Sequence, residues 1–150
     1  MKSLLVLLLT IFPLLSLASS RGEDQFIEKV YSVIEAKNGT FREVAPADLN
    51  PKQLAGLMKA AREEADIWYD TILEGDYILN SEADIEVVEL SQYYSASGEL
   101  VAYRAVIQHA AFDVGEDNCT PGYISSGIFI SPDFRFHFRD EDAIEDFTEL

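Results

Sequence analysis

The chain offers two histidines for acid–base chemistry, His109 and His137, among its 150 residues. His109 falls near Glu86 in the strand pairing expected below, and a histidine oriented by a carboxylate is the minimum of a general base. Cys119, the single cysteine, could join them as a nucleophile. The sequence places no nucleophile beside His109, however, and a histidine at the edge of a core with a satisfied hydrogen bond is the commoner arrangement. A hydrolase-like enzyme using His109 and Glu86 is therefore an alternative interpretation.

A second candidate site is the only local basic patch of the chain, formed by Arg135, His137 and Arg139. Three cations at alternate positions of a strand share one face, where they could bind a carboxylate or phosphate group. The competing interpretation is that they pair with the protein's own carboxylates, which are in large excess. This surplus favours internal pairing.

A third candidate is the acidic loop from Asp113 to Asn118. Asp113, Glu116, Asp117 and Asn118 supply oxygen ligands around the flexible Gly115. Calcium takes six to eight oxygens, and this loop could provide about half of them. The spacing does not match the EF-hand pattern, so an ordinary acidic turn is the simpler interpretation. Calcium is nevertheless the only cofactor that the sequence suggests.

The charge of the chain restricts its partners. It has 27 acidic and 11 basic side chains, for a formal net charge of −16. Such a protein should repel nucleic acid and anionic membrane surfaces. Its expected partners are proteins or cationic ligands: metal ions, basic proteins or polyamines. A stripe of carboxylates on the main helix lies opposite the apolar stripe, as a solvated face would; it consists of Glu63, Asp66, Asp70 and Glu74.

The first 20 residues resemble an export signal rather than part of the fold. Lys2 precedes an apolar run from Leu4 to Leu17, and small residues follow it. This run is too short to cross a membrane and has the small-x-small pattern of a cleavage site. We expect cleavage and a periplasmic or extracellular protein that no membrane segment retains.

Asn38 and Asn118 stand in glycosylation sequons, which matter only on a eukaryotic secretory pathway. Cys119 has no internal partner for a disulfide, and the sequence leaves open whether it is buried, free or paired between chains.

The candidate residues must be positioned by a helix that the sequence specifies clearly, from Asn50 to Gly75. Asn50 suits the N-cap, Pro51 the first turn, and Gln53 the third position of a capping box, while Gly75 suits the end. Apolar side chains recur at helical spacing and define one buried face. They are Leu54, Leu57, Met58, Ala61, Ala65, Trp68 and Ile72.

The remaining elements are a first helix and a set of strands. Helical spacing predicts the first helix over 21–37, closed by Asn38 and Gly39. The hydrophobic period then changes from 3.6 to 2 after the main helix. We predict strands at 85–94, 99–112, 122–130 and 134–139, with a tight turn at Ser131, Pro132 and Asp133. That turn would place Phe136 opposite Phe129 and Phe138 over Gly127.

These elements predict an α+β fold, with two helices packed on one face of an antiparallel β-meander of about four strands. Residues 21–139 would form the single domain, and residues 140–150 a frayed or loosely helical acidic tail. No catalytic motif is assembled, so we expect a non-catalytic binding or interaction protein for a protein or cationic partner. The alternatives are the hydrolase-like enzyme and a calcium-stabilised module.

Overall fold

The computed structural model describes residues 20–72, 77–79, 85–114 and 119–149, with side chains at 20–66, 85–110 and 120–143. The chain forms a helix over 20–35, strand β1 (Thr40–Glu43), a short 3₁₀ helix η1 (Pro46–Asp48) and helix α2 (Pro51–Ile72). The strands that follow are β2 (Tyr77–Leu79), β3 (Ile85–Tyr94), β4 (Leu100–Val114), β5 (Cys119–Ile130) and β6 (His137–Glu149). Apart from Ser20, the expected signal peptide lies outside the described residues.

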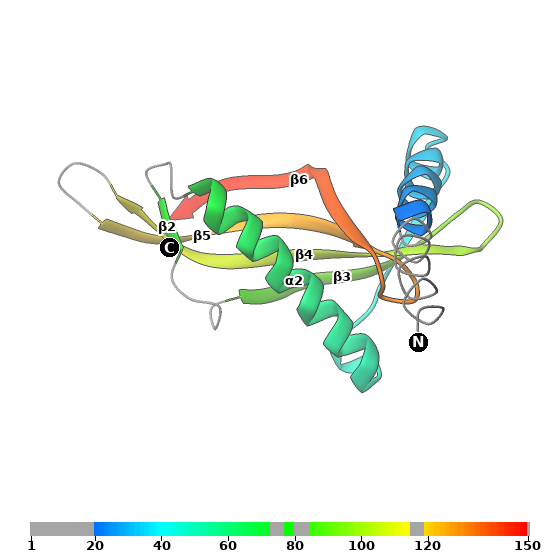
Figure 1. Cartoon of the computed structure of the whole chain (residues 1–150), viewed down its shortest axis with the longest axis horizontal. Helices are drawn as coiled ribbons and strands as arrows, with labels where there is room; N and C mark the ends of the chain where they lie inside the picture. Colours follow the sequence, from blue (N-terminus) through cyan, green and yellow to red (C-terminus); the bar gives the residue numbers. More distant parts are fainter. Residues whose placement is uncertain (1–19, 73–76, 80–84, 115–118, 150) are drawn as a thin grey trace, which may run out of the picture.

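The strands form one six-stranded sheet in the order β1-β3-β4-β5-β6, with β2 beside β4 (Figure 1). All the pairings are antiparallel. From β3 to β6, each strand pairs with the next one in the chain, which is a meander. The α+β class and the antiparallel meander are therefore confirmed.

Helix α2 begins as the sequence predicts. The Gln53 N–H donates to Asn50 Oδ1 at 2.9 Å, and the Asn50 N–H donates to Gln53 Oε1 at 3.0 Å. This reciprocal capping box satisfies backbone donors that the first turn would otherwise leave unpaired.

Helix α2 lies diagonally across one face of the sheet, which we call the α2 face (Figure 1). Leu57 and Ala60 of α2 pack there against Ala105, Ile128 and other side chains of the central strands. Of the predicted apolar stripe, Leu57, Ala61 and Ala65 are buried, Met58 is half-buried, and Leu54 is 39% exposed.

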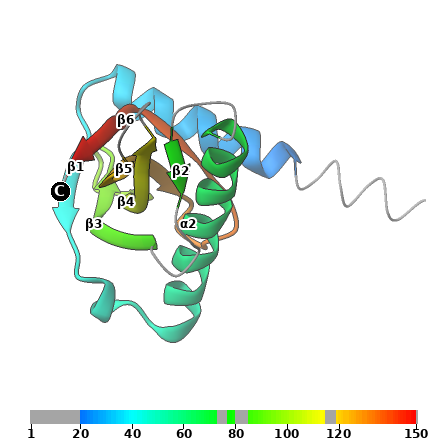
Figure 2. The ribbon, with the colours of Figure 1, turned by 90° about the vertical axis from the view of Figure 1, so that its left-hand side faces the viewer.

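The helix over 20–35 packs on the opposite face, which we call the far face. Phe129 of β5 belongs to the cluster formed with this helix, whereas its neighbours Ile128 and Ile130 belong to the cluster under α2. Successive residues of a strand point to opposite faces, so the two helices cover different faces. The expectation that both would share one face is corrected on this point. Figure 2 shows α2 running alongside the strands, whereas the N-terminal helix crosses a different side of the sheet.

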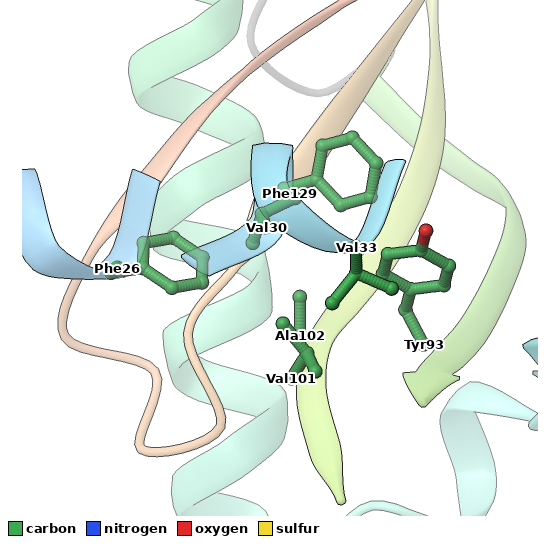
Figure 3. Packing of buried hydrophobic residues seen from close by; sticks show 7 residues of the cluster. All are labelled: Phe26, Val30, Val33, Tyr93, Val101, Ala102 and Phe129. Carbon is green, nitrogen blue, oxygen red and sulfur yellow. The ribbon is translucent and has the colours of Figure 1, made fainter. Parts of the chain in front are cut away.

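The far-face cluster combines aromatic side chains with small aliphatic ones (Figure 3). Phe26, Val30 and Val33 of the N-terminal helix lie over Tyr93 and Phe129, with Val101 and Ala102 completing the group. The rings of Phe26 and Phe138 meet edge to face with centroids 5.5 Å apart. Central strands buried on both sides explain why residues 124–131 are all buried.

The connection between β5 and β6 is longer than the predicted tight turn. The Ser131 N–H donates to the Phe136 carbonyl, and the Ser131 hydroxyl accepts the N–H groups of Arg135 and Phe136. Phe134 takes a positive φ of 58° in this loop. Consequently Phe138 faces Phe129, and Asp140 faces Gly127. The predicted register, with Phe136 opposite Phe129, was wrong by two residues because the Ser131 side chain stabilises a wider loop.

The acidic segment after residue 139 is not a frayed or helical tail but the continuation of β6, which runs to Glu149. The register slips strongly between the Gly127 and Ser125 positions of β5. A Cβ on Gly127 would lie 2.6 Å from the Cβ of Ala143 and 3.1 Å from that of Asp140. The absence of a side chain at Gly127 therefore lets the irregular part of β6 lie close against β5.

Candidate functional site

The structure does not bring His109 and Glu86 together. His109 pairs with Ile85 across β3 and β4, whereas Glu86 pairs with Gln108. Opposed residues share a face and consecutive residues do not, so the two side chains point to opposite sides of the sheet. Glu86 is exposed, and His109 is 3% exposed.

His109 is an enclosed neutral histidine rather than an accessible base. Its Nε2 has no hydrogen-bond partner among the residues that the structure describes, and burial lowers the pKa of His109 to about 4. Desolvation disfavours the imidazolium form, which explains the direction of this shift. The Ser126 hydroxyl, on the neighbouring strand and the same face, is also buried, and no described group forms a hydrogen bond with it. An imidazole enclosed in this way lacks the access to substrate that general base catalysis requires.

The residues of the basic patch are divided among separate carboxylates of the protein itself. Arg139 Nε lies 2.7 Å from Glu64 Oε1, and His137 Nε2 lies 3.6 Å from Glu63 Oε2, both across the contact between β6 and α2. Arg135 lies in the loop before β6, with its Nε 4.0 Å from Asp133. The three basic side chains therefore do not converge on one anion site, and each lies near a carboxylate of the protein itself.

Glu64 is a residue that the sequence analysis missed. It is 2% exposed and lies on the buried side of α2 with Ala60, Ala61 and Ala65. The sequence contained a signal, because Glu64 comes seven residues after Leu57 and three after Ala61, so helical spacing puts it on the same stripe as these apolar residues, where a carboxylate needs a partner. That partner, Arg139, is 75 residues away in the chain.

Calcium binding by the acidic loop stays a prediction. Glu116, Asp117 and Asn118 lie outside the described residues, and Asp113 and Cys119 are described only in their backbones, within β4 and β5. Within the described part of the chain, no group of three or more His, Cys, Asp or Glu side chains could hold a metal ion. Of the two sequons, Asn38 is exposed after the N-terminal helix.

A groove on the far face is the feature best suited to binding. It lies beyond the area that the N-terminal helix covers and consists of two adjoining hollows of about 690 and 290 Å³. Both hollows share Val88, Glu89 and Arg104. We call this feature the far-face groove and define it by Phe41, Glu43, Val88, Glu89, Arg104 and Val106. Pockets of several hundred cubic ångströms are of the size that ligands occupy.

Strand pairing brings the residues of the far-face groove together. The lateral rows are Glu43 with Ser91 and Arg104, Glu89 with Val106 and Gly127, and Glu86 with Gln108 and Ser125. Glu43 comes from β1, and the others come from β3, β4 and β5, so no short stretch of sequence contains the site. A β-bulge between Val87 and Glu89 interrupts the pairing, and Val88 there is 40% exposed.

The charge of the groove is negative because its one arginine is already paired. Arg104 Nε lies 2.7 Å from Asp140 Oδ2, and its guanidinium lies 5.8 Å from the centroid of the exposed Phe41 ring. Among the described residues, neither Glu43 nor Glu89 forms an ion pair. Asp142, which lines the smaller hollow, forms no ion pair among the described residues either, so the groove combines unpaired carboxylates with apolar contact from Val88, Val106 and Phe41.

No protein-family model matches this chain, and no curated protein or solved structure matches it either. Of the helices that the structure describes, none is both long and apolar enough to cross a membrane. The arguments for function therefore rest on the geometry of the groove and on the charge of the chain.

Proposed function

We propose that this chain is a small exported protein that binds a basic segment of another protein in the far-face groove and catalyses no reaction. The observation that carries the proposal is the contrast between paired and unpaired acids. Glu64 and Asp140 are buried and each has an arginine within 2.7 Å. Glu43 and Glu89 line the larger hollow without an ion-pair partner in the described structure. A Lys or Arg side chain from a partner would supply the missing charge.

The apolar part of the groove favours a peptide over a free metal ion. Hard cations require six to eight oxygens at short range, whereas the groove sets apolar groups, Val88, Val106 and the Phe41 ring, beside its carboxylates. A basic side chain has an apolar stem and a charged end, which matches this combination. Export is supported by the first 20 residues, whose pattern is that of a cleaved signal.

The proposal can be tested by fluorescence polarisation with residues 21–150 and a labelled peptide in which Lys and Val alternate. Glu43→Gln and Glu89→Gln together should weaken binding about fivefold, because two exposed charge pairs are lost. Glu28→Gln with Glu35→Gln is the matched control, since both residues are exposed on the N-terminal helix and the charge change is identical.

Salt distinguishes the charge contribution from apolar contact. Raising the ionic strength should weaken binding in the unaltered protein more than in the Glu43→Gln, Glu89→Gln variant, because screening acts on exposed charges. If the control variant loses as much affinity as the groove variant, net charge alone attracts the peptide and the groove is not its site. If the unaltered protein does not bind the peptide, the proposal is wrong.

A further inference from the structure

One edge of the sheet is only partly covered by β1. β1 pairs with residues 91–94 of β3 and no further. The Val44 N–H then donates to the Leu90 carbonyl at 2.9 Å, and the chain turns away through η1. Residues 85–87 and 89 of β3 pair with β4 on one side, with Val88 as the bulge, and no described strand pairs with residues 85–89 on the other side. They present backbone groups at an open strand edge.

The far-face groove follows this open edge. The larger hollow lies between Val44–Pro46, where the chain leaves the sheet, and Val87–Ser91 of β3. Five residues of strand span about 17 Å, so a short extended peptide would fit in line with β1. In the part of the chain that the structure describes, an unpaired strand edge and an adjoining hollow thus occur at the same place.

The side chains of the edge specify what an added strand should contain. Glu43, Glu86 and Glu89 lie on the far face along this edge. Val87 lies on the α2 face, where it packs against the buried cluster with Val44 and Leu49. Side chains of an added strand would alternate between these two faces. A strand of alternating basic and apolar residues would place its cations near the carboxylates and its apolar residues near Val87.

We infer that the open edge of β3 at Ile85–Glu89 receives an extended basic segment of a partner protein as an additional antiparallel β-strand. This inference rests on the proposed function and adds the mode of recognition, in which main-chain hydrogen bonds provide affinity and alternate side chains provide specificity. A second copy of the same edge is disfavoured, because self-pairing would bring Glu86 and Glu89 of both chains together, and like charges across a strand pair destabilise it.

Backbone methylation of the peptide tests the added strand directly. The probe is the Lys–Val peptide above, compared with a version N-methylated at alternate residues, which keeps the side chains and charge but removes N–H donors. Methylation on the set of residues facing β3 should weaken binding at least about tenfold, whereas methylation on the other set should have little effect. Amide hydrogen exchange within 85–89 should slow when the unmodified peptide binds, and residues 91–94, already paired with β1, should change little.

A variant of the edge provides an independent arm. Val88→Lys adds a positive charge at the exposed bulge and should weaken binding of the basic peptide, whereas Ala96→Lys adds the same charge in the exposed hairpin turn and should not. Equal binding of all methylated peptides, without exchange protection at 85–89, would overturn strand addition while leaving groove binding intact. Failure of the unmodified peptide to bind would overturn both. Protection of 85–89 by concentration-dependent dimerisation, without peptide, would assign the edge to a second copy and overturn the inference.

Discussion

Two arginines of the sheet, one on each face, meet carboxylates that are nearly removed from water. Arg139 is paired with Glu64 on the α2 face, and Arg104 is paired with Asp140 on the far face, both at 2.7 Å. Glu64 and Asp140 are 2% and 8% exposed. Attraction within such a pair mainly offsets the cost of desolvating two charges, whereas loss of one partner leaves the other uncompensated. These residues are therefore more sensitive to single than to paired substitution.

Arg139→Met should lower the free energy of unfolding by about 3 kcal/mol, because Glu64 is left buried without its partner. Urea denaturation measures this change. Arg135→Met is the matched control, since that side chain is 67% exposed and its Nε lies as far as 4.0 Å from Asp133 Oδ2. Its effect should stay within about 0.5 kcal/mol. The double variant with Glu64→Met should recover most of the loss; if it is no more stable than Arg139→Met, the pair is not the cause.

His109 should make stability depend on pH in a defined window. Burial lowers its pKa from 6.5 to about 4, so between these values the unfolded chain binds a proton that the folded protein excludes. The contribution of neutral His109 to the free energy of unfolding is complete above pH 6.5, and it decreases by about 3 kcal/mol as the pH falls towards 4. Between pH 7 and pH 4 the unaltered protein should therefore lose about 3 kcal/mol more of its free energy of unfolding than His109→Leu does, as measured by urea denaturation. Parallel pH profiles would contradict a buried neutral imidazole.

At the scale of elements, the two helices depend on different signals. α2 begins with a reciprocal cap between Asn50 and Gln53, which the local sequence specifies. The N-terminal helix ends where Lys37 takes a φ of 51° just before Asn38 and Gly39. A Cβ on Gly39 would overlap the Tyr93 ring, so this glycine lets the chain pass close to the far-face cluster before β1. Local termination and close packing coincide there.

Asn50→Ala should destabilise the protein by about 1 kcal/mol, because it removes the side-chain acceptor of the Gln53 N–H, although the backbone N–H at position 50 can still donate to Gln53 Oε1. Lys52→Ala, at an exposed position two residues along, should change stability by no more than about 0.3 kcal/mol. Amide exchange at the start of α2 should accelerate only in Asn50→Ala. Unchanged exchange at Gln53 would mean that the cap does not hold this helix end in solution.

At the scale of the whole molecule, one sheet carries two cores. Leu57 and Val30 are both 0% exposed, on opposite sides of the sheet. β5 contributes to both clusters through alternate residues, so damage to either face displaces the same strand. Burial on both faces should therefore make the domain unfold as one unit.

Val30→Ala should lower the stability by about 2 kcal/mol and shift the unfolding midpoint detected by the single tryptophan, Trp68, which lies in α2 on the other face. Fluorescence and far-ultraviolet circular dichroism should report the same midpoint. Glu28→Ala, exposed on the same helix, is the control. A fluorescence midpoint that does not move in Val30→Ala would show that the two layers unfold separately.

Local patterns in the sequence determined the class of fold and much of its layout. The cap at Asn50, the helical spacing of Leu57, Ala61 and Ala65, and the later change to a period of two depend only on residues a few positions apart. The negative net charge also follows from composition alone. Such signals act over one or two turns or one strand pair, so they can be recognised before any tertiary contact is known.

Only the tertiary structure decided which surfaces these elements cover and where a partner could bind. The helix containing Val30 has an apolar stripe that could pack on either face, and the alternation of Phe129 with Ile128 and Ile130 gives the sheet two apolar faces to offer. The wide loop at Ser131 shifts β6 by two residues, which brings Arg139 to Glu64 and Asp140 to Arg104. The groove likewise joins residues of separate strands. These outcomes depend on packing and pairing between segments far apart in the chain, which no local pattern specifies.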